Sequence, residues 1–152
     1  MYGLNVKLQN NYGKYISELL ANVNIERFIW QIEADDVIVK QNQNNLHGLF
    51  DVKNISGKTF YNAITLNEYY LIFTDYKAFF HKDDIVEIKN GMDFYNSKCE
   101  LVFLCTDSVY AEIYCKSKDI FSTILKNCKN ADILTYDIVD FDEIIKRSMI
   151  AF

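Results

Sequence analysis

Two long stretches of apolar, β-favouring residues constrain the fold more than any other feature of this sequence. Residues 69–80 read YYLIFTDYKAFF and residues 100–106 read ELVFLCT, with few polar breaks in either stretch. A strand that is apolar on both faces must be covered on both faces, which places it inside a sheet and away from the edges. The sequence therefore predicts two central strands.

The segments around them predict further elements that do not alternate strictly between strand and helix. Apolar residues at period two predict additional strands over 3–9, 28–33, 36–40, 109–115 and 132–139. Helical spacing predicts helices over 12–23, 56–66 and 117–128, and a last one that begins after Asp140. The strands 28–33 and 36–40 are expected to form a hairpin across Asp35-Asp36.

Because hairpins outnumber crossovers in this order, we expect the α+β class. The expected architecture is a single domain over residues 1–152, in which three to five helices pack on a largely antiparallel mixed sheet.

The sequence gives no indication of export or of membrane insertion. No apolar run reaches 18 residues, so neither a transmembrane helix nor a membrane partner is expected. Polar and apolar residues are interleaved over residues 1–7, which is not the pattern of a signal peptide.

The four cysteines (Cys99, Cys105, Cys115 and Cys128) lack the paired spacing of a zinc site and are expected to be reduced core residues. We expect a cytoplasmic protein without a metal or other cofactor.

The charge of the chain is unevenly distributed. The formal net charge is −5, and residues 131–143 contain five acidic residues and no basic one, so the rest of the chain is neutral. Only two arginines accompany fourteen lysines. Arginine is the preferred reader of phosphates and guanines, and phosphate attraction supplies most non-specific affinity for nucleic acid. We therefore expect no nucleic-acid partner.

An acidic segment on a neutral body is typical of a surface that attracts a basic protein. The candidate partner-binding residues are Asp137, Asp140, Asp142 and Glu143. The alternative is ordinary surface charge, since Asp140 and Glu143 also form an Asp-x-x-Glu variant of the helix capping box.

A repeated Thr-Asp pair suggests a second candidate site. Asp75 and Asp107 each follow an apolar stretch and a threonine, and neighbouring strands would bring them together at a sheet edge. Two adjacent carboxylates can hold a divalent cation or share a proton, as in a small hydrolase or a metal-dependent enzyme. The alternative is that aspartate ends strands because it favours turns. A two-residue turn at Asp107-Ser108 would place Cys105 opposite Tyr110.

Other catalytic patterns are weak. The segment Gly57-Lys58-Thr59 resembles the end of a phosphate-binding loop, but Val52 stands where the motif requires its first glycine. The simpler interpretation is a helix that starts after a Ser56 cap. Neither His47 nor His81 lies in a recognisable nucleophile motif, so no catalytic residue is assigned.

The chain is rich in tyrosine, with 11 residues, and tyrosine is enriched at protein interfaces. This composition suits protein binding or self-association, although a core built from aromatic residues is an equal alternative.

Several short segments of the sequence resemble those of a family of small bacterial proteins known only as a domain of unknown function. They are Asn11-Tyr12-Gly13-Lys14-Tyr15, Trp30, the segment 69–75, Cys99-Glu100-Leu101-Val102 and Ile113-Tyr114-Cys115-Lys116. The resemblance runs from about Gly3 to Lys129, whereas residues 139–152 depart from it. It implies a single-domain, cytosolic, bacterial protein and brings no site residues.

The function most consistent with these features is a non-enzymatic interaction module, in concrete form an acidic protein that neutralises a basic toxin. The alternatives are a small hydrolase or metal-dependent enzyme that uses Asp75 and Asp107, and a homo-oligomeric structural protein.

Overall fold

A computed structural model describes residues 1–40 and 46–151 and confirms the α+β class. The strands are β1 (Tyr2–Leu8), β2 (Ile29–Lys40), β3 (Leu46–His47), β4 (Asn54–Ser56), β5 (Glu68–Phe79), β6 (Cys99–Thr106), β7 (Tyr110–Cys115) and β8 (Ile133–Val139). The α-helices are α1 (Tyr15–Leu19), α2 (Gly57–Leu66), α3 (Gly91–Asn96), α4 (Lys118–Cys128) and α5 (Phe141–Lys146), and short 3₁₀ turns cover Ile25–Arg27 and Lys82–Asp84.

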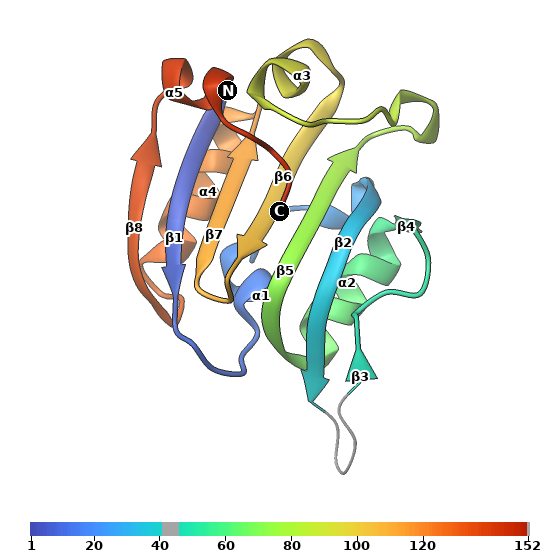
Figure 1. Cartoon of the computed structure of the whole chain (residues 1–152), viewed down its shortest axis with the longest axis vertical. Coiled ribbons are helices and arrows are strands. Elements are labelled where there is room, and N and C mark those ends of the chain that lie inside the picture. Colours follow the sequence, from blue (N-terminus) through green and yellow to red (C-terminus); the bar gives the residue numbers. More distant parts are fainter. Residues whose placement is uncertain (41–45, 152) are drawn as a thin grey trace.

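All strands belong to one sheet, in the order β3-β2-β5-β6-β7-β1-β8, with β4 also paired to β2 (Figure 1). Each pair of neighbours is antiparallel. The two apolar stretches form β5 and β6, which lie side by side in the middle of the sheet, as predicted. The described helices include none that is long and apolar enough to cross a membrane.

The predicted hairpin at Asp35-Asp36 is wrong, because residues 29–40 form the single strand β2. Two register shifts against β5 flank the acidic pair, and such bulges accommodate residues that do not fit a regular ladder. The Asp35 carboxylate accepts hydrogen bonds from the Tyr76 hydroxyl, at 2.5 Å, and from the Phe50 backbone N–H, at 2.9 Å. These long-range bonds satisfy a polar side chain that locally favours a turn.

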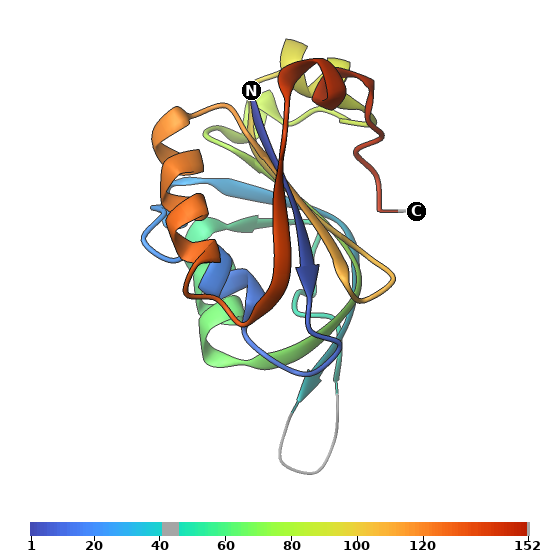
Figure 2. The ribbon, with the colours of Figure 1, turned by 90° about the vertical axis from the view of Figure 1, so that its left-hand side faces the viewer.

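Helices α1, α2 and α4 cover one face of the sheet and enclose the larger core (Figure 2). Aromatic stacking is prominent there, and the rings of Trp30 and Phe60 lie 3.8 Å apart and nearly parallel. Within the described residues, the opposite face is covered at one end, by α3, α5 and the chain that follows α5. A second, smaller core lies under them, built around Phe79, Phe94, Tyr114, Ile144 and Met149.

The starts of α2 and α4 agree with the sequence, whereas that of α1 does not. The side chains of Ser56 and Ser117 accept hydrogen bonds from the backbone N–H groups of Thr59 and Ile120, which fixes the first turns of α2 and α4. Helix α1 is shorter than the predicted 12–23 and begins after Lys14 without a side-chain cap. One of its first N–H groups, that of Ser17, donates instead to the Tyr69 hydroxyl of β5, at 3.3 Å.

Gly57 is required by packing. A Cβ atom at this position would lie 2.2 Å from the backbone oxygen of Glu26, so α2 approaches the 3₁₀ turn Ile25–Arg27 too closely for any side chain. Packing therefore explains the glycine of the Gly57-Lys58-Thr59 segment, and a phosphate-binding role is not needed to account for it.

We expect Gly57→Ala to lower the free energy of unfolding by about 1–3 kcal/mol, because backbone must move to admit the methyl group. Lys58→Ala, at an exposed position, should change it by no more than about 0.5 kcal/mol. Urea unfolding of the two variants measures the difference. Equal stabilities would contradict the packing explanation.

The hairpin between β6 and β7 is one residue longer than predicted. Thr106 pairs with Tyr110, so three residues form the connection and Cys105 lies opposite Ala111. Asp107 and Ser108 both have positive φ values, 49° and 66°, which aspartate tolerates better than most residues. All four cysteines are buried and free, as expected.

Candidate functional site

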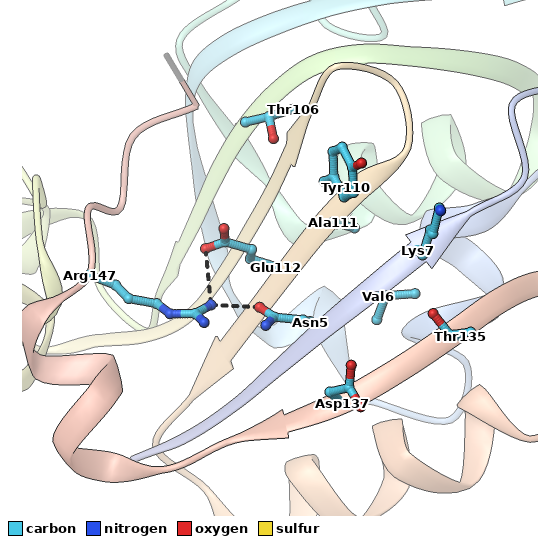
Figure 3. A pocket seen from close by; sticks show the side chains of 10 residues that line it. All are labelled: Asn5, Val6, Lys7, Thr106, Tyr110, Ala111, Glu112, Thr135, Asp137 and Arg147. Atoms are coloured by element: carbon cyan, nitrogen blue, oxygen red, sulfur yellow. Dashed lines mark hydrogen bonds and ion pairs between the residues drawn. The ribbon is translucent and has the colours of Figure 1, made fainter.

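The uncovered half of the second sheet face holds a polar groove of about 460 Å³ (Figure 3). It extends over β1, β7 and β8, with the end of β6 on one side and Arg147 on the other. The residues that line it are Asn5, Val6, Lys7, Thr106, Tyr110, Ala111, Glu112, Thr135, Asp137 and Arg147.

Strand alternation places polar side chains on this face. Asn5 lies opposite Glu112 on β7 and opposite Asp137 on β8, so the three form one row across the sheet. Leu4 and Ile113, which are sequence neighbours of Asn5 and Glu112, belong to the core on the helix-covered face. A period of two residues therefore separates the groove floor from the core.

Arg147 connects this row to the segment after α5. Its guanidinium donates to Asn5 Oδ1 at 2.6 Å and to the Tyr114 hydroxyl at 3.2 Å, and it also hydrogen-bonds Glu143. It lies 3.9 Å from Glu112 Oε2, which in turn accepts a hydrogen bond from Tyr114. Burial, together with that bond to Glu112, raises the pKa of the Tyr114 hydroxyl. Tyr114 thus stays protonated and joins a network in which each charged group has a partner.

The predicted partner-binding residues lie along one edge of the molecule. Asp137 lies on the groove floor, Asp140 caps α5 through the Glu143 backbone N–H, and Asp142 is exposed on that helix. With Asp132, just before β8, these residues and Glu143 form what we call the acidic edge. Glu143, which pairs with Arg147, is the only one of the five with an ion pair within the described residues.

The predicted carboxylate pair does not form. β5 and β6 are neighbours, but Asp75 lies inside β5, opposite Leu104, and does not end its strand. Asp107 is three residues beyond Leu104, which corresponds to about 10 Å along a strand. The two Thr-Asp pairs look alike in the sequence, but Asp75 does not end its strand, because β5 continues to Phe79.

Asp75 instead pairs with Lys77, two residues away on the same face. Lys77 Nζ lies 2.6 Å from Asp75 Oδ1, and the two residues are 1% and 3% exposed. Burial raises the pKa of the Asp75 carboxyl, against the opposing effects of Lys77 and of a hydrogen bond from the Ala151 backbone. The pair lies at a cavity of about 320 Å³ next to Ile150 and Ala151.

The described residues contain no cluster of three or more histidine, cysteine or acidic side chains that could hold a metal ion. Burial raises the pKa of the Cys99, Cys105 and Cys115 thiols to about 12 and that of Cys128 to about 11. A thiol reacts as its thiolate, so these groups are poor nucleophiles at neutral pH.

Residues 1–150 match a family model described as "Protein of unknown function (DUF2691)". The chain belongs to this family. The match of the DUF2691 model includes residues 139–150, which corrects the expectation that the C-terminal stretch departs from the family.

Among curated proteins, the chain is similar to the "Uncharacterized protein YncE" of Bacillus subtilis (strain 168), with 30% identity over 131 residues. The alignment covers 86% of each protein. No solved structure matches the chain significantly.

Of the residues that line the groove of this DUF2691 protein, only Asp137 was predicted from the sequence as a site residue. Asn5 and Glu112 lie at the polar positions of alternating strands, and Arg147 is one of only two arginines. Those signals were present, but residues 5, 112 and 147 meet only through the order of the strands. Asp75 and Lys77 were detectable locally, because residues two apart on a strand share a face.

Proposed function

We propose that this chain is a non-enzymatic protein-interaction module that binds a basic protein through its acidic edge. A protein that neutralises a basic toxin is the concrete form of this proposal. The observation that carries it is the exposure of the acidic edge, where Asp132, Asp137, Asp140 and Asp142 have no ion-pair partner in the described part of the chain.

The placement of these carboxylates supports an intermolecular role. A surface acid beside a base or at a helix N-terminus has a stabilising role within its own fold. Asp140 fits that description as the cap of α5, and Glu143 fits it through Arg147. Asp142 fits it in part, because it lies in the first turn of α5. Asp132 and Asp137 do not, because they are exposed, have no ion pair among the described residues and lie in a segment, residues 131–143, that contains no basic residue.

Charges of one sign on one surface accelerate encounter with an oppositely charged partner and favour it over others. Asp137 also borders the groove, so a lysine or arginine of the partner could enter beside it and contact the Asn5 row. In this arrangement the groove accommodates the basic side chain of the partner, and the acidic edge attracts the partner by its charge.

The test is capture of a partner from a lysate of the source organism by tagged wild-type protein and two charge-matched variants. One variant carries Asp132→Asn, Asp137→Asn and Asp142→Asn, which leaves the cap and the Arg147 pair intact. The control carries Asp51→Asn, Asp83→Asn and Asp119→Asn, at exposed positions outside the acidic edge. We expect a basic protein to be retained by wild type and control and lost by the acidic-edge variant. Equal retention by both variants would contradict the proposal.

A further inference from the structure

We propose that the partner binds by adding an extended strand to the free edge of β8, with basic side chains toward the groove and apolar side chains toward the helix-covered side. This inference rests on the proposed function and specifies how the acidic edge is recognised. It is carried by the difference between the two edges of the sheet.

One edge of the sheet ends in short strands of two and three residues, and the other ends in the seven-residue strand β8. On the outer side of β2, the short strands β3 and β4 pair with residues at its two ends (Figure 1). β8 pairs with β1 on its inner side and has no described strand on its outer side. A strand at an open edge presents unpaired N–H and C=O groups to any extended chain.

β8 has few of the features that normally protect such an edge. Charged side chains, especially lysine, together with proline and bulges are the usual deterrents to strand addition. β8 contains neither lysine nor proline, and its one register shift lies at its start, opposite Leu8. Its one charged residue, Asp137, opposes addition of an acidic or apolar strand but not of a basic one. From Thr135 to Val139 it pairs regularly with β1. A regular stretch of five residues is therefore available as a template.

The two sides of β8 differ in chemistry. Thr135 and Asp137 project toward the groove. Tyr136 and Ile138 lie opposite Val6 and Leu4, so they project to the helix-covered side, where they are 36% and 64% exposed. An added strand would extend both surfaces. It needs a lysine or arginine near Asp137 and apolar residues beside Tyr136 and Ile138.

Charge favours a basic partner over a second copy of this chain. A twofold pairing of β8 with itself would bring two acidic edges together and place both Asp137 side chains on the same face of the new ladder. Like charges on facing strands destabilise such a pair. A basic strand gains from the same geometry.

Two synthetic seven-residue peptides provide the probe. The first alternates lysine and valine, and the second has the same sequence and charge but carries methyl groups on the backbone nitrogens of its central valine and of the next lysine. Backbone N–H groups alternate in direction along a strand, so one of these two positions must face β8. We expect the unmethylated peptide to bind at least about tenfold more tightly, because the methyl group removes a ladder hydrogen bond and blocks the approach of the strand. Fluorescence anisotropy of labelled peptides gives the two affinities.

Ile138→Lys should also reduce binding of the unmethylated peptide, by about tenfold, because it removes an apolar contact and adds a like charge. Val52→Lys is the matched control, since Val52 is 59% exposed and lies between β3 and β4 at the other edge. Both sites are exposed, so both variants should fold.

The outcomes separate the two proposals. Equal, salt-sensitive binding of both peptides would overturn strand addition and leave recognition of a basic partner standing. Absence of binding by either peptide would overturn strand addition and count against the proposed function as well. A dimer that disappears in Ile138→Lys would assign the edge to a second copy and overturn the basic partner.

Discussion

Lys77→Met is expected to destabilise the protein by about 3–5 kcal/mol, because it leaves the Asp75 carboxylate buried without its counter-ion. Both residues are almost completely buried, and Lys77 Nζ lies within 2.6 Å of Asp75. The double variant Asp75→Asn/Lys77→Met should recover most of this loss, since the amide stays an acceptor for the Ala151 backbone and carries no charge. Urea unfolding of the single and double variants measures both effects.

Lys98→Met is the matched surface control. Lys98 Nζ lies 3.1 Å from Asp84 Oδ1, but its side chain is 76% exposed, so the loss should stay below about 1 kcal/mol. Equal losses for Lys77→Met and Lys98→Met would show that the buried pair has no special role in the fold.

The stability of Lys77→Met should also depend on pH in a defined direction. Burial already raises the pKa of Asp75, and removal of Lys77 removes the largest effect that opposes it. In the folded state Asp75 then keeps its proton at pH values where the same carboxyl in the unfolded chain, with a pKa of about 3.9, has released it. The free energy of unfolding therefore falls as pH rises between these two pKa values. The double variant should lack this slope.

Arg147→Ala is expected to lower the free energy of unfolding by about 2–3 kcal/mol, because one guanidinium joins α5 to the sheet. The substitution leaves Asn5, Tyr114 and Glu112 without their shared donor. We expect the segment after α5 to lose its attachment first, which hydrogen exchange of residues 141–151 would detect.

The other arginine provides the control. Arg27 is exposed and lies 5.0 Å from the ring centroids of Phe28 and Phe80. Its replacement by alanine should cost no more than about 1 kcal/mol, the value of an exposed cation–π contact. Similar losses for the two arginines would mean that the Arg147 network does not hold α5.

Local signals were sufficient to predict most of the fold. β5 and β6 are long, apolar and β-favouring, so their central position follows from composition alone. The caps at Ser56, Ser117 and Asp140 are interactions over three residues, and all three were predictable. The continuous strand β2 was not, because the bonds that keep Asp35 in it come from Tyr76 and Phe50.

The candidate site was predictable only in part. The acidic segment was visible in the sequence, but its placement on an open sheet edge depends on β8 pairing with the N-terminal strand β1. The Asn5–Arg147 contact joins residues 142 positions apart. Asp75 and Asp107 were predicted to form a pair because each follows an apolar stretch and a threonine. The structure instead places Asp75 beside Lys77.

The central claim is that the acidic edge attracts a basic protein. The measurement that tests it most directly is the amount of partner retained by the Asp132→Asn/Asp137→Asn/Asp142→Asn bait, divided by the amount retained by the Asp51→Asn/Asp83→Asn/Asp119→Asn bait at the same ionic strength. We expect a ratio far below one and a retained protein that is basic. A ratio near one, or a retained protein that is acidic, would contradict the proposed function.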